Sequence, residues 1–119
     1  MSNYFTSLEL ACQHCGESNF DTDFLALLNS IREECNFPFI VTSAYRCEKH
    51  PLEARKERLG EHTTGKAIDI AVEHDKALKL LEVALRHGVK RIGIKQKGSG
   101  RFIHLGVSTD FPSPALWSY

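Results

Sequence analysis

The sequence predicts a single α+β domain over residues 1–119, with two main helices packed on a small, mostly antiparallel sheet of about four strands. Residues 22–35 and 75–87 carry apolar side chains at helical spacing. Short β-rich segments lie between and after them. The last two of these segments flank the turn 97–100, which is typical of an antiparallel hairpin. A length of 119 residues fits one compact domain.

The first half of the chain contains one helix, one strand and one long loop. Asp21 or Thr22 can cap the helix 22–35, and it ends before Pro38, since proline cannot continue a helix. Residues 39–46 are expected to form a strand that leads into a loop. The polar segment 47–64 is that loop, with a short helical turn around 52–58, and long loops in small domains are often functional.

The second half is more regular. Residues 66–72 predict the second strand, and the helix 75–87 follows it with Gly88 as its C-cap. Residues 91–95 and 102–107 predict the third and fourth strands. We expect the proline-containing tail after Asp110 to be irregular.

Charge and hydropathy exclude several classes of function. Lys+Arg and Asp+Glu are both 15, so the formal net charge is zero and no broad electrostatic case exists for binding nucleic acid. No apolar run approaches the roughly 18–20 residues needed to insert into a membrane. The N-terminus lacks the pattern of a signal peptide. We therefore expect synthesis in a cytoplasm and a monomeric protein.

The four cysteines leave several states open. Cys12 and Cys15 form a C-x2-C pair, whereas Cys35 and Cys47 stand apart and do not form a second pair. Free thiols in a reducing compartment are the first interpretation, with a structural zinc ion or a disulfide as alternatives. A redox or zinc-ribbon protein built on the C-x2-C pair lacks a second motif.

Asp69 is the residue that most needs an explanation. It lies between Ile68 and Ile70 in an apolar strand, where a carboxylate is costly unless a cation meets it. His62 and His104 are possible partners, because zinc accepts imidazole nitrogen and carboxylate oxygen together. His104 shares a strand face with positions 102 and 106, where a glycine would leave room for a metal ion or substrate. Structural hydrogen bonds are the alternative for each residue taken alone.

Three segments, taken in order, carry a family resemblance. They are SAYRCEKHP (43–51), GEHTTGKAIDI (60–70) and RFIHLGV (101–107). Together they resemble the zinc D-Ala-D-Ala carboxypeptidase family, which includes stand-alone phage and bacterial peptidases. The opening FTSLELACQHCG and the ending PSPALWSY also resemble the phage-type subgroup, whose start contains a short helix. The resemblance covers nearly the whole chain and implies a hedgehog/DD-peptidase-like fold.

The resemblance implies roles for individual residues. His62, Asp69 and His104 match the three zinc ligands. Arg46 matches an arginine that faces the substrate, where its guanidinium can hold a carboxylate or a developing oxyanion. Further matches lie beside the site: Ser43 and Tyr45 as orienting or substrate-binding residues, His50 as a residue near the site or a plain loop residue, and Trp117 as a substrate contact.

Two departures from the family pattern leave the general base open. The family has a serine before the first histidine, where this chain has Glu61, and an aspartate two residues after the last histidine, where this chain has Gly106. Related peptidases also often carry an acid or a histidine shortly before the last ligand, but Arg101, three residues before His104, cannot act as a base. Glu61 is the nearest candidate carboxylate in the sequence, with His50 and Asp110 behind it, and a solvated loop charge is the alternative for Glu61.

The function implied is a zinc metallopeptidase acting on peptidoglycan stem peptides. Either a D-Ala-D-Ala carboxypeptidase or an L-Ala-D-Glu-type endopeptidase is compatible with the residues. A phage product of this kind would degrade the cell wall as an endolysin released through a holin, or as part of a virion. The alternative is a catalytically impaired zinc-binding module that serves in the virion or binds the cell wall, as the similar domain of hedgehog proteins binds zinc without a demonstrated peptidase role.

Overall fold

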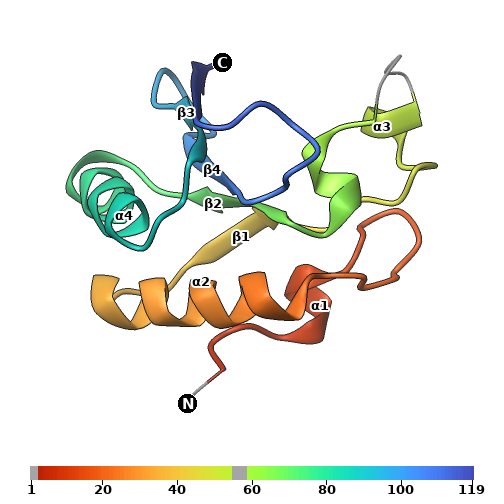
Figure 1. Cartoon of the computed structure of the whole chain (residues 1–119), viewed down its shortest axis with the longest axis horizontal. Coiled ribbons are helices and arrows are strands. Elements are labelled where there is room, and N and C mark those ends of the chain that lie inside the picture. The colour runs from red at the N-terminus through yellow and green to blue at the C-terminus, as the bar shows by residue number, and fades with distance from the viewer. Residues whose placement is uncertain (1–2, 55–58) are drawn as a thin grey trace.

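The predicted α+β class is confirmed by a computed structural model, which describes residues 3–54 and 59–119 (Figure 1). The described part contains a five-stranded sheet with the strand order β1-β2-β4-β3-β5. Its helices are α1 (Ser7–Leu10), α2 (Thr22–Cys35), α3 (Pro51–Ala54), α4 (His74–Arg86) and the 3-10 helix η1 (Glu61–Thr64).

The two long helices begin and end where their sequences predict. The carboxylate of Asp21 caps α2 by accepting a hydrogen bond from the backbone N–H of Phe24 at 2.8 Å. Asn36 ends α2 in the left-handed conformation, with φ of 61°. Helix α4 lies within one residue of the predicted range at each end, and Gly88 follows it with φ of 89°.

The sheet consists of β1 (Ile40–Ser43), β2 (Ala67–Ala71), β3 (Arg91–Lys95), β4 (Phe102–Gly106) and β5 (Ala115–Ser118). The antiparallel β3–β4 hairpin is confirmed. The expectation of an irregular tail is wrong, because residues 115–118 form an edge strand parallel to β3. The first strand is also shorter than the predicted 39–46.

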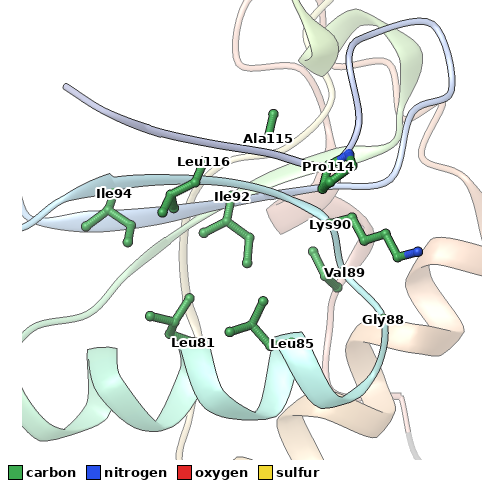
Figure 2. A pocket seen from close by; sticks show the side chains of 10 residues that line it. All are labelled: Leu81, Leu85, Gly88, Val89, Lys90, Ile92, Ile94, Pro114, Ala115 and Leu116. Carbon is green, nitrogen blue, oxygen red and sulfur yellow. The ribbon is translucent and has the colours of Figure 1, made fainter.

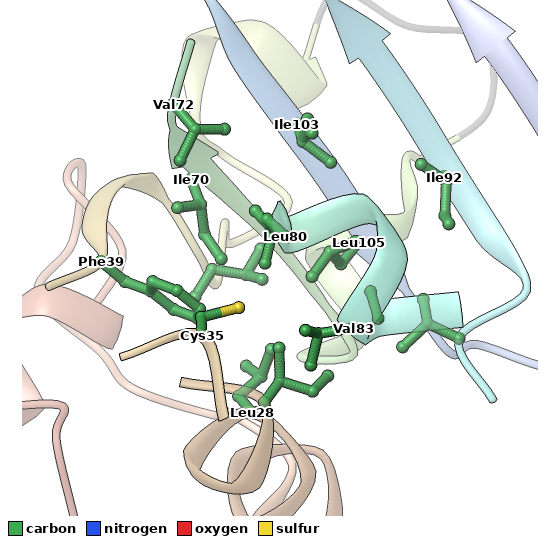
Figure 3. Close-up of a cluster of buried hydrophobic side chains, with 14 of the residues drawn as sticks. Leu28, Cys35, Phe39, Ile70, Val72, Leu80, Val83, Ile92, Ile103 and Leu105 are labelled. Atoms are coloured by element: carbon green, nitrogen blue, oxygen red, sulfur yellow. The ribbon is translucent and has the colours of Figure 1, made fainter. Parts of the chain in front are cut away.

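The core lies between one face of the sheet and the helices α2 and α4 (Figure 3). Ile70, Ile103 and Leu105 point from the sheet toward Leu28 of α2 and Leu80 of α4. These five side chains are at most 1% exposed. Each contributes about 1.5–3 kcal/mol through burial. Because side chains alternate along a strand, the intervening residues face the opposite side of the sheet.

An apolar hollow lies on the helix side of the sheet, between α4 and the edge strand β5 (Figure 2). Leu81 and Leu85 of α4 face Ile92 of β3 and Leu116 of β5 across it. It has a volume of about 630 Å³. Trp117, the next residue along β5, lines a different cavity on the other face.

The long loop after β1 contains α3 and η1. The predicted helical turn begins at Pro51, and residues 55–58 of that prediction lie outside the described residues. Among the helices in the described ranges, none is long and apolar enough to cross a membrane.

Candidate metal centre and substrate cavity

The open face of the sheet carries one continuous row of residues across all five strands. The register places Ser43, Asp69, His104, Gly93 and Trp117 side by side, from β1 to β5. A Cβ added to Gly93 would lie 2.3 Å from Nε1 of Trp117, so the indole ring covers this glycine. The absence of a side chain at Gly93 of β3 therefore lets Trp117 approach His104, with ring centroids 5.2 Å apart.

His62 reaches this row from the 3-10 helix η1. Gly65 ends η1 with φ of 74°, a conformation that favours glycine. A Cβ at Gly65 would lie 2.0 Å from the carbonyl oxygen of Asn19, so the turn also packs too closely for any side chain. Nδ1 of His62 lies 2.6 Å from the carbonyl oxygen of Ala44. The other ring nitrogen, Nε2, is directed to Asp69.

His62, Asp69 and His104 meet at a single point. Their ligand atoms lie within 4.8 Å of one another, and all three residues are buried. Oδ1 of Asp69 is 3.2 Å from Nε2 of His62 and 2.9 Å from Nδ1 of His104. Two imidazole nitrogens and one carboxylate oxygen form a donor set typical of catalytic zinc sites, which keep a fourth position open. The residues present therefore fit a zinc ion.

The charges at this point favour a bound cation. Burial alone raises the pKa of Asp69, but hydrogen bonds from His104 and His62 outweigh it and hold the pKa well below its usual range. Burial lowers the pKa of His104, yet its hydrogen bonds to Asp69 and Glu61 raise it overall. The His104 ring lies between these two carboxylates, with Nδ1 2.9 Å from Oδ1 of Asp69 and Nε2 2.8 Å from Oε1 of Glu61. A metal ion would replace the proton on its Nδ1.

Glu61 occupies the space that the missing side chain of Gly106 leaves. A Cβ at Gly106 would lie 2.2 Å from both carboxylate oxygens of Glu61. From there, Glu61 accepts hydrogen bonds from Nε2 of His104 at 2.8 Å and from the backbone N–H of Ser108 at 3.1 Å. Histidines that bind metals usually donate their second ring N–H to such a carboxylate, which fixes the ring orientation. A carboxylate is thus present at this position, although it comes from η1 rather than from β4.

Arg91 holds the other side of Glu61. Its Nε donates to Oε2 of Glu61 at 3.0 Å, and its guanidinium also donates to the carbonyl oxygen of Pro112. The same guanidinium lies 5.0 Å from the ring centroids of Phe111 and Trp117. Burial raises the pKa of Glu61, but hydrogen bonding to His104, Ser108 and Arg91 lowers it overall. Glu61 is therefore ionised at neutral pH.

Arg46 lies at the opposite end of the same site. Its Nε donates to Oγ of Ser43 at 3.0 Å, and its Nη1 lies 3.1 Å from Oε2 of the fully buried Glu53. Nη2 is 3.7 Å from Oδ2 of Asp69. The backbone N–H of Gly60 donates to the other oxygen of Glu53 at 2.7 Å. Glu53 thereby fixes both the arginine and the start of η1.

These residues line a cavity of about 240 Å³, whose described lining consists of Arg46, Glu61, His62, Asp69, Arg91, Phe102, His104, Trp117 and Tyr119. Sequence reasoning singled out six of these residues and missed Arg91, Phe102 and Tyr119. Four other candidates are not among the lining residues: Ser43, which supports Arg46; Tyr45, whose hydroxyl accepts from Asn19; His50, in the loop beside His14; and Asp110, beyond β4.

Fold and site together define an α+β domain with a candidate metal centre. The family model of peptidase M15 matches residues 3–106, and the chain belongs to this family. Peptidases of this family are hydrolases that typically depend on a metal ion, which agrees with the candidate ligands found here. No curated protein and no solved structure matches the chain.

Proposed function

We propose that the protein is a zinc-dependent peptidase that hydrolyses peptidoglycan stem peptides, at the D-Ala-D-Ala bond or at an internal L-Ala-D-Glu-type bond. The observation that carries the proposal is the convergence of His62, Asp69 and His104 at the floor of a cavity. A zinc ion held by these three residues would supply a Lewis acid and a water of lowered pKa.

Arg46 is proposed to bind the anionic part of the substrate. Its guanidinium lines the cavity and is positioned from behind by Ser43 and Glu53. An arginine held in this way can accept a terminal carboxylate or stabilise negative charge that develops on a scissile carbonyl. The negative charge of Glu53 offsets part of the desolvation penalty of placing the Arg46 guanidinium in this cavity.

Glu61 is proposed to act first as a positioning residue for His104. All three of its described contacts are hydrogen-bond donors, and its pKa is lowered, so it is a weak proton acceptor in the metal-free protein. Its role as general base stays a prediction. The pH dependence of kcat distinguishes the roles, because replacing a base removes one limb of the profile, whereas replacing a positioning residue lowers kcat across it.

The aromatic residues are proposed to shape the entrance. Trp117 and Tyr119 of the C-terminal segment line the cavity together with Phe102 of β4, and the rings of Phe102 and Tyr119 lie 5.0 Å apart. Such rings offer apolar contact to the side chains of a stem peptide and exclude water from the floor of the cavity.

A direct test is the digestion of purified peptidoglycan with and without a chelator, followed by mass spectrometry of the released fragments. We expect chelator-sensitive fragments whose masses identify the bond. His104→Ala should release none, while His87→Ala, which changes a surface histidine paired with Glu34, should behave as the wild type. A wild-type protein that holds zinc and releases no fragment would refute the peptidase proposal.

That last result would favour a zinc-stabilised virion-structural or cell-wall-binding module. One observation supports this second candidate: in the described part of the cavity, the carboxylates belong to Asp69 and Glu61, and both already hold His104. Binding of the protein to intact peptidoglycan without cleavage, measured by co-sedimentation, would support it.

A further inference from the structure

Three of the four cysteines gather at the end of β1, outside the cavity described above. The sulfur atoms of Cys12, Cys15 and Cys47 lie within 4.8 Å of one another. Cys12 is buried, Cys47 is half-buried and Cys15 is exposed. The backbone N–H of Cys47 donates to Sγ of Cys12 at 3.3 Å, so the two segments already meet at sulfur.

Each of the two segments forms a tight turn around its cysteine. In the first, the backbone N–H of Gly16 donates to the carbonyl oxygen of Cys12 at 2.8 Å, and Gly16 has φ of 78°. In the second, the backbone N–H of His50 donates to the carbonyl oxygen of Cys47 at 3.0 Å. The sequence therefore contains two knuckles, C-x2-C at 12–15 and C-x2-H at 47–50. A search for cysteine pairs alone overlooks the second one.

We propose that Cys12, Cys15, Cys47 and His50 bind a structural zinc ion, separate from the metal of the candidate peptidase site. Three thiolates and one imidazole form one of the common closed tetrahedral sets. Sulfur atoms about 2.3 Å from a tetrahedral zinc ion lie roughly 3.8 Å apart, which is compatible with the observed cluster.

His50 is assigned as the fourth ligand because it lies in the same turn as Cys47. Its ring nitrogens lie outside the group of sulfur atoms that are within 4.8 Å of one another, so its side chain would have to turn toward them when zinc binds. Its Nδ1 accepts a hydrogen bond from the backbone N–H of Leu52 at 3.2 Å, so this nitrogen is unprotonated. Binding of zinc through Nδ1 would replace that hydrogen bond. The ring of His14 lies beside it, with centroids 6.3 Å apart, and provides a matched control.

The position of this site gives it a structural consequence. Cys47 directly follows Arg46, and α3, which carries Glu53, begins directly after His50. Two further hydrogen bonds join the same segments: Tyr45 N–H to the carbonyl oxygen of Leu10 at 3.3 Å, and Gln13 Nε2 to the carbonyl oxygen of Thr42 at 2.9 Å. Zinc would thus fasten the N-terminal segment to the loop that presents the arginine.

The test uses the full chain with the peptidase site disabled by His62→Ala and His104→Ala, purified with reductant and without chelator. Elemental analysis should find about one zinc ion per chain, and X-ray absorption should show sulfur at about 2.3 Å from zinc. Cys47→Ser in this background should lose the zinc, whereas Cys35→Ser should retain it. Loss of a residue that only hydrogen-bonds a metal ligand typically lowers metal affinity by roughly 10–100-fold. His50→Ala should lower the affinity for zinc by more than this, whereas His14→Ala should leave the affinity unchanged.

Several results would overturn the proposal. They are a zinc ion with no sulfur neighbour, no zinc at all in a folded background, or a disulfide among the three cysteines found by peptide mapping without reduction. Folding is monitored by circular dichroism. Should the double-histidine background fail to fold, wild-type and Cys47→Ser proteins are compared instead, and equal zinc content and equal sulfur scattering in both would contradict the site. Because these readouts are independent of peptidase activity, failure of the proposed function leaves them interpretable.

Discussion

Substituting Gly106 by aspartate should destabilise the protein, and replacing Glu61 by serine at the same time should restore much of the loss. The substitution reintroduces the acid that the family pattern has two residues after the last histidine. In this chain, however, the space is taken, because a Cβ at Gly106 would lie 2.2 Å from both carboxylate oxygens of Glu61. Glu61 is held there by Arg91, Ser108 and His104 and has no simple way to move aside.

The magnitude follows from two costs. Overpacking a tightly filled interior costs about 1–3 kcal/mol. A buried charge without a partner costs about 3–5 kcal/mol, and the new carboxylate would face one of the same sign. We therefore expect Gly106→Asp to lose at least about 3 kcal/mol, out of a total of about 5–15 kcal/mol for a native domain. Gly106→Ala measures the steric cost without the charge.

The assay is a double-mutant cycle of four proteins: wild type, Gly106→Asp, Glu61→Ser and the double variant. Urea unfolding gives the free energy of each, and zinc content is measured in parallel. In the double variant, the carboxylate introduced at position 106 can accept a hydrogen bond from His104, so this protein should be more stable than additivity predicts by about 1–3 kcal/mol. If the two effects add within about 0.5 kcal/mol, Glu61 does not replace the missing acid.

Three other predictions concern pH, backbone and thiol chemistry. Folding lowers the pKa values of Asp69 and Glu61, so in the metal-free protein the two carboxylates contribute their full stabilisation of the folded state above their unfolded pKa values of about 4. This contribution is lost as the pH falls through the lower folded pKa values, so the free energy of unfolding should decrease less steeply with falling pH in Asp69→Asn than in the wild type. Gly65→Ala should cost more in thermal unfolding than Gly98→Ala, because both have positive φ but only Gly65 meets backbone, at 2.0 Å; equal losses would contradict this. Burial raises the pKa of Cys35 to about 11, so a thiol reagent at pH 8 should leave Cys35 unmodified in the folded protein, and its rapid modification would show that the core is open.

Much of the fold could be predicted because its signals are local. The Asp21 cap and the apolar spacing of residues 22–35 define α2 without reference to any distant residue. Residues 115–118 were missed as a strand because two prolines precede the segment, and its partner β3 lies more than 20 residues away. Only the tertiary structure supplies that pairing.

The site shows the same division between local and long-range information. Alternation along β2 and β4 predicts that Asp69 and His104 face one side, and the register places them directly opposite each other. The roles of Glu53 and Arg91 cannot be predicted from the sequence. Glu53 pairs with Arg46, 7 residues away, and Arg91 pairs with Glu61, 30 residues away. A charged residue in a polar loop or at the end of a strand has no distinctive sequence pattern. The carboxylate beside His104 comes from position 61 instead of position 106, which a linear motif cannot reveal.

The most direct test of the metal centre compares the thermal unfolding of metal-free wild-type and Asp69→Ala proteins before and after zinc is added. A ligand that binds only the folded state stabilises it by about 2.7 kcal/mol at 100 times its Kd. We predict a zinc-dependent rise in Tm in the wild type, most of which is absent in Asp69→Ala, with any shared remainder due to the cysteine cluster. An equal rise in both proteins, or none in either, would contradict the assignment of Asp69 as the anionic ligand of a zinc ion.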